Sequence, residues 1–264
     1  PIAAGAMGPP SLAASGRARF RSPSGGRRGR PGEGGTHMQI QDTAAVVTGG
    51  GSGIGRAMAV ALAERGCSVV VADIDTAGGQ ATVESILAAG GRAVFHRCDV
   101  RHTEDVANTI AAAVEHYGRF DIMCNNAGVG GEDLFGDDDA GWKRMVDINF
   151  TAMIEGTRIA GREMRRRGGG GVVVNTASMG GLVPMAEAPV YAATKAGIIH
   201  FTRSLAGLAG ECGVRVNAIC PTYTATPLFT DVEGERSEEL KAQVGEPRPY
   251  RTAFDEDDGS VVDW

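Results

Sequence analysis

Tyr191, Lys195 and Ser178 are the side chains whose types and spacing indicate proton chemistry. Tyr191 and Lys195 lie four residues apart near the start of a predicted helix that begins at Pro189, so they share one face of it. An ammonium group beside a phenol favours the phenolate and lowers its pKa from about 10, which predicts an acid or base for neutral pH. Ser178 follows a predicted strand, where its hydroxyl could polarise a substrate oxygen, although a serine there is more commonly a turn residue.

A second group of residues has the pattern of a dinucleotide-binding turn. Segment 48–55 has the sequence TGGGSGIG and joins a predicted strand to a predicted helix. Small residues there let backbone amides and the helix N-terminus approach a pyrophosphate. Asp73 follows about 20 residues later, where its carboxylate can accept both hydroxyls of a ribose. A flexible loop, and a helix cap for Asp73, are the alternative interpretations.

The same residues predict which dinucleotide binds. No Lys or Arg lies between Gly49 and Gly55 or directly after Asp73, and a carboxylate repels the 2'-phosphate of NADP. We therefore predict NAD as the cofactor. The expected contacts from this region are Gly49, Ser52, Gly53, Ile54, Gly55, Asp73 and Ile74.

Alternating strands and helices must position these side chains. Short apolar runs predict strands at 44–48, 68–72, 93–98, 120–124, 171–177 and 214–220, and helical spacing predicts helices at 54–64, 76–89, 103–117, 141–167 and 189–211. Strands that are apolar on both faces form parallel sheets covered by helices on both sides. We predict a single-domain α/β fold with a doubly wound, Rossmann-like parallel sheet of six clear strands. Ligands of such sheets lie beyond the carboxyl ends of the strands.

The composition excludes several classes of function. The 264 residues are 42% hydrophobic, enough for a sizeable core, and the net charge of -6 disfavours nucleic acid as a partner. No apolar run is long enough to span a bilayer. Five widely spaced cysteines, without metal-ligand spacing to the five histidines, fit buried thiols of a reducing compartment. We expect a cytoplasmic protein with a small-molecule substrate and no metal, membrane or nucleic-acid partner.

The two ends differ from the middle in composition. Residues 1–37 contain nine Gly, five Pro and six Arg against one acid, and such a segment is expected to be disordered. An organellar transit peptide is one interpretation; we favour a non-native extension, with Met38 as the natural first residue. Residues 38–245 are predicted to form the NAD-binding catalytic domain. Residues 246–264 are predicted to be a mobile acidic tail.

Several motifs together resemble the short-chain dehydrogenase/reductase family. They are TGGGSGIG at 48–55, NNAG at 125–128, Asn149, Ser178 and YAATK at 191–195, and the resemblance spans about 38–229. It implies that Tyr191 is the catalytic acid/base and that Ser178 steadies the substrate oxygen. It also implies that Lys195 binds the nicotinamide ribose and lowers the Tyr191 pKa, and that Asn149 holds a water in a proton relay.

The resemblance implies further cofactor contacts. Asp99 and Val100 would frame the adenine, although Asp99 could instead cap the next helix. Asn126, Ala127 and Gly128 would brace the cofactor side of the sheet, although Asn126 could be an ordinary turn residue. Beyond the sixth strand, the matching positions are Pro221, Thr224 and Thr226.

Two features depart from the family pattern. Pro221 is followed by Thr222 where the family usually has glycine, and a β-branched residue disfavours a positive φ, so we expect a reshaped turn. The seventh strand that normally ends such a chain cannot be identified after Gly245.

The resulting functional prediction is a dehydrogenase that moves a hydride between NAD and a secondary alcohol or ketone. A non-catalytic NAD-binding sensor or scaffold on the same fold is the alternative. Within the family, segments 169–199 and 201–204 look nearest to dehydrogenases of hydroxylated fatty acids, such as the 15-hydroxyprostaglandin dehydrogenase-like subgroup. Met179 and Met185 are predicted to form an apolar substrate wall for a hydroxy-lipid or steroid-like molecule. These two methionines could instead pack under their own loop. Helices 141–167 and 189–211 are predicted to form the interface of a homodimer or homotetramer.

Overall fold

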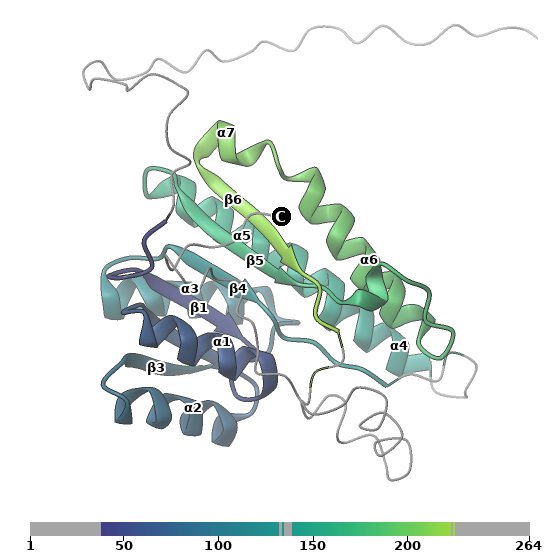
Figure 1. Ribbon diagram of the computed structural model, residues 1–264, viewed down its shortest axis with the longest axis horizontal. Coiled ribbons are helices and arrows are strands. Elements are labelled where there is room, and N and C mark those ends of the chain that lie inside the picture. The colour runs from purple at the N-terminus through teal and green to yellow at the C-terminus, as the bar shows by residue number, and fades with distance from the viewer. Residues whose placement is uncertain (1–37, 132–133, 135–138, 223, 225–264) are drawn as a thin grey trace, which may run out of the picture. The chain divides into compact units, whose positions relative to one another are not determined.

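One parallel sheet forms the centre of the protein (Figure 1). The computed structural model describes residues 38–131, 134, 139–222 and 224. The strands are β1 (Ala44–Thr48), β2 (Ser68–Asp73), β3 (Arg92–Arg97), β4 (Ile122–Asn125), β5 (Gly171–Thr176) and β6 (Val214–Ile219), all paired in parallel in the order β3-β2-β1-β4-β5-β6. The chain therefore winds outward from β1 in one direction and then from β4 in the other, which confirms the predicted doubly wound fold.

Helices connect successive strands. They are α1 (Gly53–Glu64), α2 (Thr76–Ala88), α3 (Thr103–Tyr117), α4 (Asp139–Val146), α5 (Ala152–Arg166), α6 (Pro189–Ser204) and α7 (Leu208–Cys212), with a short 3₁₀ turn η2 (Met179–Gly181) after β5. The two longest predicted helices differ from the structure. A π-helical turn, η1 (Asp147–Thr151), separates α4 from α5. The helix predicted over 189–211 is interrupted between Ser204 and Leu208, where a turn separates α6 from α7.

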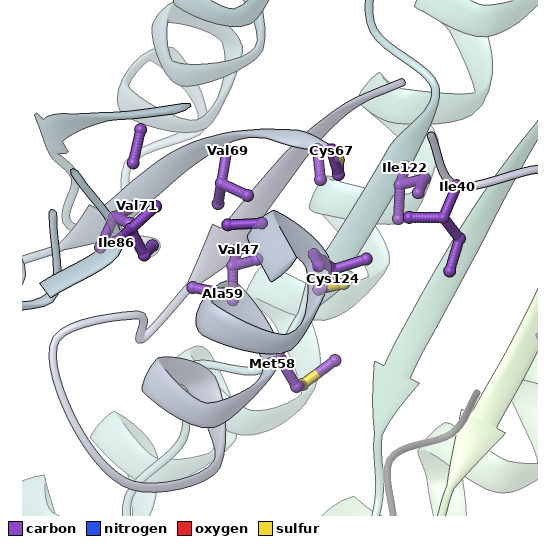
Figure 2. Close-up of a cluster of buried hydrophobic side chains, with 14 of the residues drawn as sticks. Ile40, Val47, Met58, Ala59, Cys67, Val69, Val71, Ile86, Ile122 and Cys124 are labelled. Carbon is purple, nitrogen blue, oxygen red and sulfur yellow. The ribbon is translucent and has the colours of Figure 1, made fainter. Parts of the chain in front are cut away.

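The sheet is buried on both faces by two separate sets of side chains. On one face, Val47 and Val71 pack with Ala59 of α1 and Ile86 of α2 (Figure 2). On the other face, the neighbouring residues of the same strands pack against α3 and α5, as Val46 does. Every residue of β1 is buried, which is why residues 44–47 are continuously apolar rather than alternating. This two-sided core fixes the strand ends, where the candidate site lies.

Some predictions fall outside the part of the chain that the structure describes. These are segments 1–37 and 246–264 and the region where the seventh strand was not identified. Within the described part, no helix combines the length and the apolar character needed to cross a membrane. All five cysteines are free thiols, and Cys67, Cys98 and Cys124 are buried.

Candidate active site

A cavity of about 260 Å³ opens at the carboxyl ends of the strands, around the point where β1 and β4 lie side by side. Helices leave these two strands for opposite faces of the sheet, which creates a crevice at this place in doubly wound folds. Of the residues predicted as site residues, the lining contains Gly49, Ser52, Gly53, Ile54, Asp73, Ile74, Asp99, Val100, Asn126, Ala127, Gly128, Ser178, Tyr191, Lys195 and Pro221. Segments far apart in sequence therefore meet at one site.

The glycine-rich turn after β1 is shaped by close backbone approaches. Gly49 has a φ of +65°, a conformation that favours glycine. A Cβ on Gly55 would lie 2.0 Å from the carbonyl oxygen of Gly49, so Gly55 closes the turn from behind and does not line the cavity. Ser52, Gly53 and Ile54, at the start of α1, do line it. The turn and the helix N-terminus thus form a cradle whose chemistry fits a pyrophosphate.

Asp73 connects this turn to the end of β2. Its Oδ2 accepts a hydrogen bond of 2.7 Å from the backbone N–H of Gly51, and its Oδ1 accepts one of 2.9 Å from the N–H of Asp75. The cap of α2 is Asp75, whose Oδ1 accepts from Ala77 N at 3.1 Å. Asp73 is therefore not the helix cap, and it lines the cavity.

Asp99, beyond the end of β3, is held by Arg101. The carboxylate accepts from the Arg101 Nε at 3.0 Å and from its backbone N–H at 3.1 Å. These bonds hold the pKa of Asp99 at about 2, against a burial effect in the opposite direction. The residue before α3 is His102, which makes no side-chain cap. Asp99 is thus ionised at neutral pH, and it lines the cavity together with Val100.

Tyr191 and Lys195 occupy successive turns of α6 and are both buried, with exposed fractions of 7% and 3%. The Lys195 Nζ lies 5.6 Å from the centroid of the Tyr191 ring and donates a hydrogen bond of 2.8 Å to the carbonyl oxygen of Thr176. Ser178 precedes η2, and its Oγ accepts from the N–H of Gly180 at 3.1 Å. The phenol, the ammonium and the serine hydroxyl therefore meet on one side of the cavity.

Burial is the largest influence on the pKa values of Tyr191 and Lys195. Burial raises the pKa of Tyr191, and a hydrogen bond with the Ser178 side chain opposes that shift only in part. Burial also lowers the pKa of Lys195 to about 8. In the protein by itself, desolvation of the phenolate therefore sets the direction of the Tyr191 shift, and the lowering of this pKa by Lys195 stays a prediction.

Asn149 lies in η1 and is fully buried. Its Oδ1 accepts from the N–H of Val129, and its Nδ2 donates to the carbonyl of Val129, both at 2.8 Å. A Cβ on Gly128 would lie 3.3 Å from Asn149 Oδ1 and 3.6 Å from Lys195 Nζ. The amide thus fixes the chain after β4 beside the lysine, and its Oδ1 and Nδ2 each keep capacity for one further hydrogen bond.

Other predicted site residues lie away from the cavity or outside the described residues. Met179 is 36% exposed, and a Cβ on Gly180 would lie 2.2 Å from the sulfur of Met185, which therefore packs on η2. Neither methionine is among the lining residues, so the predicted methionine wall is not part of this cavity. Thr224 is also absent from the lining, and Thr226 is outside the described residues.

The turn after β6 accommodates Thr222 without strain. Among the described residues other than glycine, Asp42 alone has a positive φ, so Thr222 adopts an ordinary backbone conformation while lining the cavity. Sequence reasoning missed several lining residues because they follow no motif. They are Cys98, Arg101, Val129, Arg144, Ile148, Thr176, Ala177 and Thr222.

Comparison with known proteins agrees with this geometry. The family profile described as "short chain dehydrogenase" matches residues 43–237. A 15-hydroxyprostaglandin dehydrogenase [NAD(+)] of Bos taurus is 37% identical over 207 residues, which are 76% of this chain and 75% of that protein. A cyclohexanol dehydrogenase of Acinetobacter sp. is 33% identical over 213 residues, which are 79% of this chain and 84% of that protein.

A solved structure gives the same result. The structure is 7 alpha-hydroxysteroid dehydrogenase complexed with NADH and 7-oxo glycochenodeoxycholic acid, and it superposes with a TM-score of 0.72 at 31% identity over 78% of this chain and 80% of the other. The order of the strands, the motifs at their carboxyl ends and the extent of these matches agree. The chain therefore belongs to the short-chain dehydrogenase family.

Proposed function

We propose that this protein transfers a hydride between NAD and a secondary alcohol or ketone, with Tyr191 as the group that exchanges the proton. The observation that carries the proposal is the meeting of Tyr191, Ser178 and Lys195 in the same cavity as the glycine turn. Within one crevice, a substrate oxygen can reach a proton donor while its carbon faces a dinucleotide.

The residues along the cavity suit each part of NAD. The turn and the N-terminus of α1 would hold the pyrophosphate, Asp73 the adenosine ribose, and Asp99 and Val100 the adenine. Lys195 would bind the nicotinamide ribose, because its ammonium is buried at the cavity and keeps donors beyond the one that Thr176 uses. When bound, NAD would accept the hydride in oxidation of an alcohol, and its reduced form would donate the hydride in reduction of a ketone.

The protein's own part of the reaction is control of one proton. Ser178 would hold the substrate oxygen by a hydrogen bond, beside the Tyr191 Oη. Since burial raises the pKa of Tyr191, the resting group is the neutral phenol, which can protonate the oxygen of a ketone during reduction. For oxidation, Tyr191 must first lose its proton and then accept one from the alcohol.

The ribose contact predicts how strongly the protein discriminates between cofactors. NAD should bind at least tenfold more tightly than NADP, because a 2'-phosphate would face the Asp73 carboxylate, and Asp73→Ala should reduce this ratio. Arg97 lies opposite Asp73 in the β2–β3 register. In Asp73→Ala, a 2'-phosphate would therefore have a cation on the neighbouring strand and no carboxylate to repel it. Titration of both cofactors against protein fluorescence gives the four dissociation constants.

Asp75→Ala is the matched control for that measurement. It removes the same charge two residues away, where the carboxylate caps α2. Asp75→Ala should leave the NAD/NADP ratio unchanged. Equal binding of the two cofactors by the unmodified protein would contradict the assignment of Asp73.

For the substrate class, we propose an apolar molecule, such as a hydroxy-lipid or a steroid-like alcohol. Leu182 and Val183, four and five residues after Ser178, are 51% and 50% exposed, which gives the chain beside the proton donor an apolar surface. The relatives named above act, by their names, on a hydroxyprostaglandin, on cyclohexanol and on a hydroxysteroid. These substrates share a carbinol within a hydrocarbon frame.

A panel of secondary alcohols with NAD tests both the reaction and the substrate class. Reduced cofactor should form, and kcat/KM should rise up to about fourfold for each methylene added to an aliphatic secondary alcohol, since each buried methylene contributes up to about 0.8 kcal/mol. Preference for small polyols or sugars would contradict the apolar substrate alone. Tight NAD binding with no turnover on any alcohol or ketone would instead favour the sensor or scaffold.

Two further properties are proposed from the sequence. The family resemblance supports a homodimer or homotetramer built on the helical region that includes α5 and α6. Five free thiols support a reducing, cytoplasmic location.

A further inference from the structure

Thr176, the last residue of β5, lies between the lysine and the glycine-rich turn. Its carbonyl oxygen accepts from the Lys195 Nζ at 2.8 Å, while its hydroxyl donates to Asn126 Oδ1 at 3.2 Å. Asn126 Nδ2 in turn donates to the carbonyls of Thr48 at 3.1 Å and Gly49 at 3.5 Å. One continuous set of hydrogen bonds therefore joins the ammonium to the turn.

The Asn126 amide is held from both sides, by two carbonyl oxygens of the turn and by the hydroxyl of Thr176. The two carbonyl oxygens of Thr48 and Gly49 can only accept, so they require the NH₂ side of the amide. The Oδ1 side must then face β5, where the Thr176 hydroxyl supplies its donor. Thr176 is 6% exposed, and removal of its hydroxyl leaves the Asn126 Oδ1 without this protein donor.

Close packing makes the turn sensitive to this amide. A Cβ on Gly49 would lie 3.1 Å from Asn126 Nδ2, and a Cβ on Gly55 would lie 2.6 Å from the same atom. The amide therefore fills the space between β4, the turn and the start of α1. A displacement of Asn126 would change its contacts with the backbone that forms the pyrophosphate cradle.

We propose that Thr176 is a positioning residue for the cofactor: its hydroxyl, acting through Asn126, holds the glycine-rich turn in the conformation that binds a dinucleotide. The inference extends the proposed function. It is tested by NAD binding without any substrate, so its failure is distinct from a failure of the dehydrogenase assignment.

Thr176→Val and Thr176→Ser separate the hydroxyl from the shape of the side chain. Valine keeps the shape without the donor, and serine keeps the donor without the methyl group. Thr176→Val should raise the dissociation constant for NAD by about twofold to tenfold, the range expected for one neutral hydrogen bond, while Thr176→Ser should bind NAD like the unmodified protein. With a substrate from the alcohol panel, KM for NAD should rise and kcat at saturating NAD should stay within about twofold.

Thr202→Val provides the matched structural control. Thr202 is also 6% exposed, and its hydroxyl accepts from Asn175 Nδ2 at 3.1 Å, with no bond to Asn126. This variant should lower the melting temperature and leave NAD affinity unchanged. If Thr176→Val does not fold, Thr176→Ala removes the same donor without requiring space for a branched side chain.

A double-mutant cycle with Asn126→Ala tests the route of the effect. If Thr176 acts through Asn126, Thr176→Val should produce no further loss of NAD affinity in the Asn126→Ala background. Three results would overturn the proposal: unchanged NAD affinity in Thr176→Val, equal weakening in Thr176→Ser, or a full effect of Thr176→Val without Asn126.

Discussion

Tyr191→Phe should lower kcat by about 10² to 10⁴, because it removes the one proton-exchanging group beside the substrate oxygen and keeps the ring. That loss corresponds to about 3 to 5 kcal/mol of transition-state stabilisation. The dissociation constant for NAD should change less than about threefold, since the phenol hydroxyl is assigned to the substrate. Steady-state turnover of an alcohol found in the panel, together with NAD titration, gives both numbers.

Tyr117→Phe is the control for Tyr191. The hydroxyl of Tyr117 donates to the carbonyl of Val69 at 3.3 Å, and burial raises its pKa to about 12, but the residue is not at the cavity. Its loss should affect stability and leave kcat unchanged. Retention of most activity by Tyr191→Phe would mean that another group exchanges the proton.

Lys195→Met should reduce both kcat and NAD affinity by more than tenfold, because the ammonium is assigned to the nicotinamide ribose.

The effect of Lys195→Met on the stability of the protein should depend on pH. The pKa of Lys195 is about 8 in the folded protein, against 10.5 for an exposed lysine. Between pH 8 and 10.5 the unfolded chain therefore binds more protons than the folded protein. As a result, the free energy of unfolding of the unmodified protein increases as pH rises through this range. Below about pH 8 the destabilising effect of the buried charge is fully present.

Methionine fills a similar volume without that charge. The melting temperature of Lys195→Met relative to the unmodified protein should therefore be highest near pH 7 and should fall as pH rises from about 8 to 10.5. Lys143→Met, on the exposed surface of α4, should show no such trend. A difference independent of pH would contradict a buried charged lysine.

Most of the fold could be predicted because the strands are buried on both faces. A continuous apolar run such as 68–72 predicts β2 within one residue, since every side chain there meets a covering helix. The π-helical turn could not be predicted, because it accompanies a pairing between Asn149 and Val129, which lie on separate segments. The interruption after Ser204 was missed because apolar spacing continues past it.

Residues of the candidate site could be predicted where the backbone conformation or a close backbone approach allows only glycine. Gly49 and Gly55 mark close approaches that any side chain would block. Thr176 and Arg101 line the cavity because their strand end and loop lie next to other segments in the folded protein. No sequence pattern indicates these neighbours. The direction of the Tyr191 pKa shift depends on burial, which spacing along a helix does not reveal. The packing of Met185 against Gly180 depends on the η2 turn, which has no sequence signal of its own.

The hydrogen bond from Gly51 to Asp73 bears on attempts to change the cofactor preference. Glycine loses more conformational entropy on ordering than any other residue, and a run of three would be loose without a partner. The carboxylate oxygen at 2.7 Å preorganises that run before any dinucleotide arrives. Exchange of Asp73 for a cationic residue would add a phosphate contact and, in the same step, remove the acceptor of the Gly51 N–H, while the bond of 3.1 Å from the Gly50 N–H to the Ala72 carbonyl would remain. A second substitution that restores an acceptor for Gly51 should therefore improve a switch to NADP.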